Sequence, residues 1–522
     1  LKNSDARWHV MDLLKHAPYS KSEICRGAGC GAGVVNTLIG AGVLIPFMVE
    51  KKKAFSPPRP DFRKVKLSPE QQAAADALVQ KVGRGFSVTL LDGVTGSGKT
   101  EVYFEAAAEV LKNGRQVLIL VPEISLTTQW LARFENRFGA RSALFLPYTD
   151  LGLIVVDESH DHSFKQEEIV NYQCRDMAVM RAKFEQFPLI LSTATPDLET
   201  MVNVESGKYD AVRLTRRFAD ARLPELKIVD LKKDKPQKGP WGVSWLSPPL
   251  VGALEENLQK GEQSMLFLNR RGYAPLVICR DCGYRIQCPN CTAWLAEHRS
   301  TNRLICHHCG YTMVRPVRCP DCGSEEGLTS CGPGVERIAE EVAKRFPAAR
   351  TAVLSSDTTS SLAEVSEIFG KMERGELDIL IGTQILAKGH HFPELTLVGI
   401  VDADLGLMGS DLRAAEQTYQ LLSQVAGRAG RGEKSGEVWI QTLYPENAVL
   451  QALVDNDRGR FLELEKQTRQ MLKLPPFGRL AALVVSGENQ TLTEKAAAEL
   501  GRTGFGPGFR PRAGAGADIH AA

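Results

Sequence analysis

The chain has 522 residues, of which 43% are hydrophobic and 24% are charged, and its formal net charge is only +2. These values are ordinary for a soluble globular protein, and the near-neutral balance excludes a surface that attracts nucleic acid everywhere. Any basic groove must therefore be local. The length predicts roughly three to four domains of about 150 residues each. The start of the chain shows no basic-then-apolar export segment, so we expect a cytoplasmic protein with no membrane partner.

The first 50 residues predict a small helical unit. Helical patterns cover residues 6–16, 20–26 and 34–41, and residues 43–49 have the pattern of a strand, which together outline a winged helix. Both a DNA-binding role and a packing role are open for this unit. The uncharged run at 31–49 contains four glycines and a proline, which favours helix, turn and strand over a membrane span.

A phosphate-binding loop follows a prolyl, basic linker at residues 51–66. Residues 86–91 form a short apolar run typical of a buried strand, and residues 101–108 begin a helix. Between them stands Gly93-Val-Thr-Gly-Ser-Gly-Lys-Thr100, the G-x-x-x-x-G-K-[ST] pattern in its required context. Its glycines let backbone N–H groups surround phosphates at the positive end of the helix. Lys99 is predicted to reach the β- and γ-phosphates of ATP, and Thr100 to ligate Mg²⁺. The loop residues predicted to bind the nucleotide are Gly93, Gly96, Ser97, Gly98, Lys99 and Thr100.

A second buried strand ends in carboxylates at Leu153-Ile-Val-Val-Asp-Glu-Ser-His160. Asp157 is predicted to hold Mg²⁺, Glu158 to orient the attacking water, and His160 to belong to the same catalytic group. Alone, this segment could be an acidic strand end facing solvent, but the phosphate loop upstream weighs against that interpretation. A third strand exits through the small hydroxyl residues Ser192-Thr193-Ala194-Thr195.

The C-terminal half again shows the pattern of a strand that leads into a polar loop. Asp378–Gly389 is a strand that leads to a Gly-Thr-Gln loop, and Gln424-Val-Ala-Gly-Arg-Ala-Gly-Arg431 places two arginines three residues apart. Arg428 and Arg431 are predicted to act as arginine fingers on the γ-phosphate, a role worth about 10³–10⁵ in rate. A solvated basic helix is the alternative, but each glycine in the motif costs about 1 kcal/mol of helical stability.

Eight of the twelve cysteines form four C-x-x-C pairs. Two such pairs can close one tetrahedral Zn²⁺ site, so four pairs predict two structural zinc ions. Spacing leaves open which pairs share an ion: sequential pairing and nested pairing are both compatible with it. Cys25, Cys30, Cys174 and Cys331 are predicted to be ordinary thiols. The predicted ligands are Cys279, Cys282, Cys288, Cys291, Cys306, Cys309, Cys319 and Cys322.

Together these motifs resemble the PriA family of bacterial replication-restart helicases, which belong to helicase superfamily 2. The likeness runs from residue 1 to about residue 490, and its most specific element is the cysteine block inserted in the second half. The matching stretches include residues 92–103, 121–126, 141–145, 157–161, 267–273 and 382–393, with the arginine motif.

The resemblance implies two RecA-like α/β lobes with an N-terminal winged helix, and a two-zinc cysteine-rich module inserted in the second lobe. It implies that Gln71 reads the adenine edge, that Gly389 contributes to the nucleotide site, and that zinc pairing is nested. One ion would take Cys279, Cys282, Cys319 and Cys322, and the other Cys288, Cys291, Cys306 and Cys309. Residues 161–175 resemble an aromatic-rich loop that couples DNA contact to hydrolysis, with Phe164 and Tyr172 as candidate stacking residues.

The resemblance also implies an ATP-dependent helicase that moves 3′ to 5′, recognises stalled forks and promotes restart by primosome assembly. Its expected partners are forked and single-stranded DNA, single-stranded DNA-binding protein, and primosome proteins including the replicative helicase loader. Two alternatives are a duplex DNA translocase and a zinc-stabilised fork-docking scaffold with a vestigial ATPase. The intact lysine, carboxylates and arginines weigh against the scaffold.

The expected domain order follows from these assignments. Residues 1–50 form a winged-helix-like domain, 51–66 a linker, 67–225 the ATP-binding first lobe, 226–278 the start of the second lobe, 279–322 the zinc module, 323–450 the rest of the second lobe, 451–500 a partial C-terminal domain, and 501–522 a flexible tail. Little sequence lies between residue 129 and the strand at 151, so we expect residues to be missing near Phe138–Gly139. We also expect the family's domain that captures a DNA 3′ end to be missing from the sequence.

Overall fold

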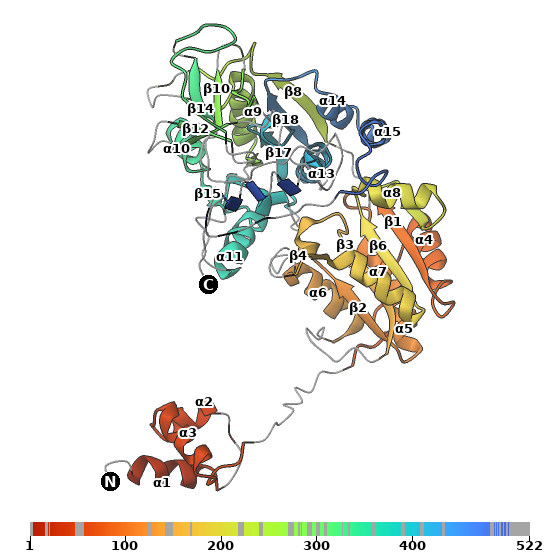
Figure 1. Cartoon of the computed structure of the whole chain (residues 1–522). Helices are drawn as coiled ribbons and strands as arrows, with labels where there is room; N and C mark the ends of the chain where they lie inside the picture. The colour runs from red at the N-terminus through yellow and green to blue at the C-terminus, as the bar shows by residue number, and fades with distance from the viewer. Residues whose placement is uncertain are drawn as a thin grey trace. The chain divides into compact units, whose positions relative to one another are not determined.

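The computed structural model is an α/β protein with two parallel sheets, as the sequence predicts (Figure 1). It divides into two units, Leu1–Pro57 and Pro58–Ala522. Within the described residues, no helix is long and apolar enough to cross a membrane. The structure describes residues 4–15, 19, 21–46, 57–122, 127–140, 150–166, 170–217, 224–237, 239, 244–269, 276–279, 282, 284–289, 295–298, 303–306, 311–325, 327–331, 335–355, 362–387, 392–407, 412–430 and 434–480, and nine single positions between 485 and 500 (485, 487, 489, 492, 493, 495, 496, 499 and 500).

The first unit is a cluster of three helices, as predicted. They enclose a small apolar core made by Val10, Ile24, Val35 and Leu38. Residues 43–46, the described part of the expected strand, form no strand, so the wing of a winged helix stays a prediction. The three helices are α1 (Ser4–Leu13), α2 (Lys21–Gly27) and α3 (Ala32–Gly40).

The first parallel sheet has the strand order β2-β3-β6-β1-β7 and is covered on both faces. Successive side chains of a strand point to opposite faces, so Leu91 packs under α4, α5 and α6 while Leu90 packs under α7. Its strands are β1 (Ser87–Gly93), β2 (Gln116–Leu120), β3 (Leu151–Asp157), β6 (Pro188–Thr193) and β7 (Asp210–Leu214). Its helices are α4 (Pro69–Val79), α5 (Lys99–Lys112), α6 (Thr127–Phe138), α7 (Cys174–Glu185) and α8 (Leu198–Glu205). A short 3-10 turn, η2 (His162–Phe164), and the hairpin of β4 (Lys165–Gln166) and β5 (Tyr172–Gln173) follow β3.

The second parallel sheet has the order β15-β16-β9-β17-β18-β8 and is also covered on both faces. Leu266 packs with α9 and α10, whereas its neighbours Met265 and Phe267 pack with α11, α13, α14 and α15. Its strands are β8 (Glu225–Asp230), β9 (Gln263–Phe267), β15 (Thr351–Leu354), β16 (Ile379–Gly382), β17 (Leu395–Ile400) and β18 (Glu437–Thr442). Its helical segments are α9 (Pro248–Gln259), α10 (Val335–Arg345), α11 (Leu362–Glu373), η4 (Gln384–Ala387), α12 (Asp404–Leu407), α13 (Ala414–Ala426), α14 (Ala448–Val454) and α15 (Arg458–Met471).

The cysteine-rich module lies between β9 and α10 of the second sheet, as an antiparallel sheet of its own with the order β13-β12-β11-β10-β14. Its core contains the apolar side chains Val277, Ile286, Leu295 and Leu304 together with two of the cysteines. Its strands are β10 (Leu276–Cys279), β11 (Ala296–His298), β12 (Arg303–Ile305), β13 (Thr312–Val314) and β14 (Leu328–Cys331).

A buried ion pair joins this module to the second sheet. Arg285 Nη2 donates to Asp404 Oδ2 at 3.1 Å, and the two side chains are only 2% and 1% exposed. Asp404 also accepts from the backbone N–H of Leu443 at 2.9 Å and from the hydroxyl of Thr442. Burial and the nearby Asp402 raise the pKa of Asp404 to about 6, although the charge of Arg285 opposes them.

Replacing Arg285 by glutamine is expected to lower the free energy of unfolding by about 3–5 kcal/mol, because it leaves a buried carboxylate without its cation. Urea denaturation followed by fluorescence measures this. Arg318→Gln is the matched control, since Arg318 pairs with Glu325 in the same module but both side chains are more than half exposed. Adding Asp404→Asn to the Arg285 variant should recover part of the loss. Equal stability of the two single variants would contradict the prediction.

Candidate nucleotide-binding site and metal centre

The phosphate loop joins β1 to α5 in the context that the sequence predicts. Gly96 and Gly98 have φ values of +82° and +80°, which L side chains rarely adopt. A Cβ atom on Gly98 would also lie 2.4 Å from Gln71 Nε2, so only glycine fits there. Lys99 begins α5 and is buried, and its Nζ donates to the carbonyl of Gly93 at 2.8 Å. The loop is therefore a closed backbone cradle with one buried ammonium group.

Gln71 is positioned against this loop by a capping box at the start of α4. Its Oε1 accepts from the N–H of Ser68 at 2.9 Å, and Ser68 Oγ accepts from the N–H of Gln71. Its Nε2 donates to the carbonyl of Ser97 at 2.8 Å. The structure thus brings Gln71 next to the nucleotide loop, and its contact with adenine stays a prediction.

Asp157 ends β3 beside the loop and is held by two hydroxyl groups. Ser192 Oγ donates to Asp157 Oδ1 at 2.8 Å, and the phenol of Tyr103 donates to Oδ2 at 2.9 Å. Trp130 Nε1 in turn donates to the Tyr103 oxygen at 2.8 Å. Burial and then the adjacent Glu158 raise the pKa of Asp157. The chain thus fixes the direction of this carboxylate through side chains from α5, α6 and β6.

Glu158 follows in a strained conformation. Its φ is +46°, which is rare for a residue with a side chain and marks a position that the surroundings impose. Its Oε2 is buried and, among the described residues, has no hydrogen-bond partner. It lies 3.7 Å from Nδ1 of His160. An acceptor held in this way suits a small donor such as water.

His160 connects the two sheets. Gln424 Nε2, on α13, donates to its Nε2 at 2.6 Å, so the ring proton lies on Nδ1, which donates to Thr193 Oγ1 at 2.7 Å. Burial lowers the pKa of His160, in spite of the neighbouring carboxylate of Glu158, and so favours the neutral ring. The acidic strand of the first sheet is therefore linked directly to the start of the arginine motif.

Arg428, in the middle of that motif, is buried. Its Nη2 donates to the carbonyl of Ala387 at 2.5 Å, and burial lowers its pKa to about 10 although the charge of Glu158 acts in the opposite direction. A Cβ atom on the preceding Gly427 would lie 3.2 Å from two carbon atoms of Thr95 in the phosphate loop. Arg428 thus lies close to both the loop and Glu158. Arg431 and Gly389 lie outside the described residues.

These groups fit a nucleoside triphosphate with Mg²⁺. The loop offers backbone donors and one ammonium, and buried oxygens of Ser97, Glu158 and Thr195 have no partner within the described part of the chain. Carboxylate and hydroxyl oxygens are the ligands that Mg²⁺ prefers, and Asp157 and Thr100 supply one of each. Because Asp157 and Glu158 are neighbouring carboxylates, a divalent cation would offset their repulsion.

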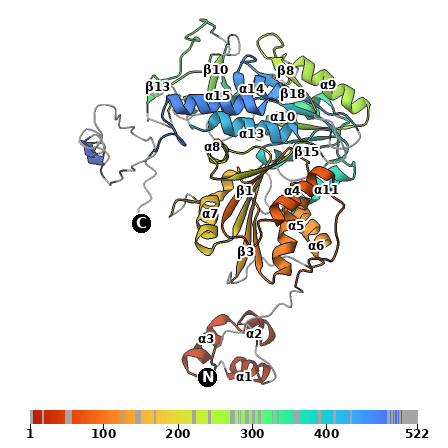
Figure 2. The same ribbon diagram turned by 90° about the vertical axis from the view of Figure 1, so that its right-hand side faces the viewer.

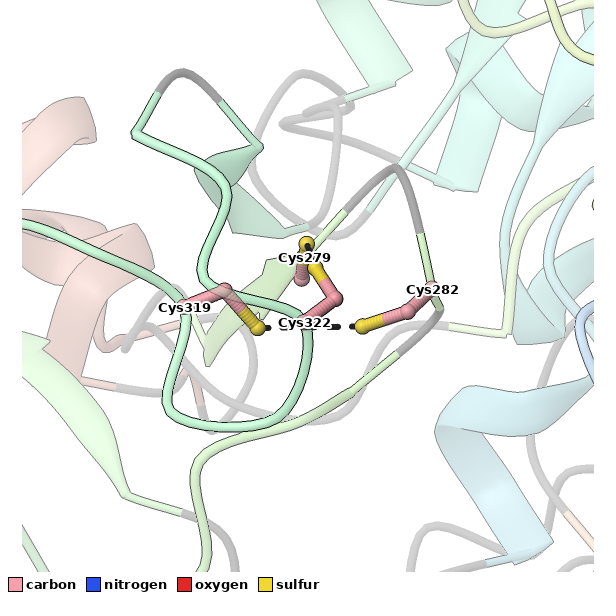
Figure 3. Close-up of side chains that lie close together, drawn as sticks. All are labelled: Cys279, Cys282, Cys319 and Cys322. Atoms are coloured by element: carbon pink, nitrogen blue, oxygen red, sulfur yellow. Dashed lines mark hydrogen bonds between the residues drawn. The ribbon is translucent and has the colours of Figure 1, made fainter.

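The metal centre is formed by the first and fourth C-x-x-C pairs. The sulfur atoms of Cys279 and Cys322 are 3.6 Å apart, those of Cys282 and Cys319 are 3.7 Å apart, and all four lie within 4.8 Å of one another (Figure 3). Four thiolates at about 2.3 Å from Zn²⁺ would be about 3.8 Å apart, whereas a disulfide needs about 2.05 Å. The set therefore fits a closed structural zinc site.

Backbone groups support the thiolate form of one ligand. Burial opposes ionisation of Cys319, but the N–H groups of Cys322 and Asp321, together with the neighbouring thiols, lower the pKa of this thiol to about 7, whereas burial and the neighbouring thiols raise the pKa of Cys282. The nested pairing is the one that the structure shows for these four ligands. Of the other set, Cys288 and Cys306 lie buried in the module core, whereas Cys291 and Cys309 lie outside the described residues.

The sequence missed the supporting shell of the nucleotide site. Tyr103 and Trp130 hold Asp157, and Gln424 holds His160, yet none was predicted as a site residue. The place of Gln424 at the head of the arginine motif was the available signal. Phe164 is only 7% exposed and packs in the core under α7, so it is not placed for base stacking; Tyr172 is 45% exposed and stays a candidate.

Comparisons with known proteins place this geometry among DNA helicases. Residues 64–146 match the family model "Type III restriction enzyme, res subunit", residues 288–313 match "PriA DNA helicase Cys-rich region (CRR) domain", and residues 333–433 match "Helicase conserved C-terminal domain". Replication restart protein PriA of Rickettsia conorii is 44% identical over 456 residues, which cover 81% of this chain and 69% of that protein.

PriA proteins of two further bacteria also match this chain, at lower identity. The PriA protein of Bacillus subtilis is 38% identical over 90% of this chain and 62% of its own length, and that of Haemophilus influenzae is 40% identical over 80% and 60%. Among solved structures, RecG bound to a three-way DNA junction aligns with 80% of this chain and 50% of that chain, at 14% identity and a TM-score of 0.46.

Proposed function

The chain belongs to the PriA family of replication restart proteins, and on that premise we propose that its two lobes form a motor that moves 3′ to 5′ on DNA and recognises stalled forks. As a family member it is an ATP-dependent DNA helicase that acts in replication restart. The observation that carries the motor is the direct contact between the acidic strand of one lobe and the arginine motif of the other, His160 with Gln424.

The positions of the described nucleotide-site residues support a role in hydrolysis for each of them. Lys99 would bind the β- and γ-phosphates, and Asp157 and Thr100 would hold Mg²⁺, which neutralises phosphate charge when bound. Glu158, whose buried Oε2 has no hydrogen-bond partner within the described part of the chain, would orient the attacking water and accept its hydrogen bond. Arg428, and with it Arg431, would bring positive charge from the second lobe.

Lobe movement would reach the DNA through the loop Ser192–Thr195. Thr193 Oγ1 contacts His160, and the carbonyl of Thr195 accepts from Gln420 Nε2 of α13 at 3.2 Å. A change at the acidic strand therefore passes into both the loop and α13. We propose that repeated opening and closing of the lobes moves single-stranded DNA across them.

The cysteine-rich module would hold two structural zinc ions in nested pairs and serve as a wedge or as a protein-docking surface. By family membership we propose single-stranded DNA-binding protein and primosome proteins, including the replicative helicase loader, as partners. The three-helix unit at the N-terminus is a second candidate DNA contact.

ATP hydrolysis with and without forked DNA bearing a single-stranded arm tests this function. Strong stimulation by the fork is expected, and Lys99→Ala should abolish it. Lys112→Ala is the matched control, because Lys112 ends the same helix and, within the described part of the chain, pairs only with exposed carboxylates. Hydrolysis that is absent or indifferent to DNA would refute the motor and favour a zinc-stabilised scaffold. Stimulation by duplex alone, without strand separation, would favour a duplex translocase.

A further inference from the structure

Helix α15 lies outside all three matched family regions, yet it contacts both lobes of the motor. Figure 2 shows it alongside α13 and above α8. On the side of the second lobe, Phe461 stacks on Tyr419 of α13 with ring centroids 4.2 Å apart and planes 1° apart. Arg469 Nη2 also donates to Glu416 Oε2 of α13 at 2.9 Å, with both side chains 3% exposed. The helix is thus fixed to α13.

The first residue of the same helix contacts the first lobe at its nucleotide edge. Arg458 Nη1 donates to Asp92 Oδ1 at 2.7 Å and Nη2 donates to Oδ2, which makes a bidentate pair. The same Nη1 donates to the carbonyl of Ala194 at 2.8 Å. Asp92 is 3% exposed and directly precedes Gly93, whose carbonyl accepts from Lys99. Arg458 therefore connects the end of β1 with the loop Ser192–Thr195.

Two further contacts, one from α13 and one from α15, reach α8 of the first lobe. Glu416 Oε1 accepts from the N–H of Leu198 at 2.7 Å, at the start of α8 in the first lobe. Lys466 pairs with Glu205 at the end of α8 at 2.7 Å. Helices α13 and α15, which are fixed to each other, therefore hold three points of the first lobe, and the one nearest the phosphate loop is the arginine pair of α15.

From these contacts we propose that Arg458 is a positioning residue of the motor. It transmits movement of α13 and α15 to the end of β1 and to the loop Ser192–Thr195, and so couples DNA binding by the lobes to ATP hydrolysis. This inference rests on the proposed function. A bidentate arginine–carboxylate pair fixes both the distance and the orientation of its two partners, so a movement of one displaces the other. A lysine in the same place would supply only a charge.

The first test compares ATP hydrolysis with and without a single-stranded dT oligonucleotide in Arg458→Gln, Arg458→Lys, Asp92→Asn and the double variant Arg458→Gln/Asp92→Asn. Stimulation by DNA should fall about 5- to 150-fold in Arg458→Gln, the usual range for a coupling between two sites. Arg458→Lys should lose less. Asp92→Asn should lose a similar factor, and the double variant no more than either single one, because both belong to one contact. Arg460→Gln is the matched control on the same helix, since the only ion pair of Arg460 with a described residue is the one with the half-exposed Asp455.

The second test uses the ligand-free protein and detects a coupling role apart from a loss of stability. Hydrogen–deuterium exchange should rise in Arg458→Gln in peptides covering 87–100 and 190–197, but not across β2 and α6. A rise over the whole chain, or DNA stimulation equal to that of the unmodified protein, would overturn the proposal. Losses in the two single variants that multiply in the double variant would also overturn it. If the unmodified protein itself shows no stimulation, the proposed function fails instead.

Discussion

Replacing Glu158 by glutamine is expected to lower kcat for DNA-stimulated ATP hydrolysis by about 10²–10⁴-fold, the usual contribution of a positioned general base. The amide keeps the shape of the side chain but removes the negative charge that orients water. Its buried Oε2 has no hydrogen-bond partner among the described residues, so the effect should fall on the reacting water and not on a structural contact. Steady-state hydrolysis measures kcat.

Binding of ATP should survive this substitution, because the phosphates are held by the loop and by Lys99. Equilibrium binding of a fluorescent ATP analogue provides that comparison. Glu109→Gln is the matched control: the Glu109 side chain on α5 is partly exposed, and its only ion pair with a described residue is the one with Lys112. A kcat within about threefold of the unmodified protein, which is well below the range for a general base, would remove Glu158 from the mechanism.

Replacing Cys319 by serine is expected to remove one zinc ion per chain, because a structural site needs all four of its ligands. Small domains bind structural zinc with an apparent free energy of about 10–16 kcal/mol, and this energy stabilises their fold. Without the ion, the module around β10 and β14 should therefore unfold. Metal analysis after gel filtration and limited proteolysis within residues 276–331 report the two effects. The large scale of that energy makes this one of the two strongest effects that we expect.

Cys25→Ser controls for the loss of a thiol as such, since Cys25 lies in the three-helix unit and belongs to no four-sulfur cluster within the described residues. In the Cys319 variant, the rate of ATP hydrolysis should fall less than the zinc content, because none of the described residues of the nucleotide site belongs to the module. Retention of zinc by the Cys319 variant at its full level would show that the four clustered sulfurs are not its ligands.

The sequence predicted the local parts of the site well. A strand, a glycine loop and a helix follow one another at 86–108, so the pattern and the geometry depend on the same few residues. Short continuous apolar runs likewise predicted buried strands of the kind found in parallel sheets. Spacing alone left the zinc pairing open, and the fold decided it for the first and fourth C-x-x-C pairs, because the pairing of β10 with β14 brings Cys279 to the level of Leu328.

Contacts between distant segments could not be predicted. Gln424 lies 264 positions from His160, and Arg458 lies 366 positions from Asp92. Local patterns contain no information on such pairs, and α15 looks like an ordinary surface helix in isolation. Phe164 illustrates the opposite failure: family likeness suggested a stacking residue, whereas burial against the sheet determined its actual role.

The antiparallel pairing of β10 with β14 brings the two ends of the cysteine-rich module together. Leu276 pairs with Cys331, so the chain enters and leaves the module on neighbouring strands, about 4.8 Å apart. An insertion with adjacent ends leaves the order of its host sheet unchanged, because β9 still pairs with β16 and β17. The module could therefore have been gained, lost or exchanged as one piece during evolution. Asp404 is the host residue whose buried charge depends on the module, since Arg285 is the cation that pairs with it.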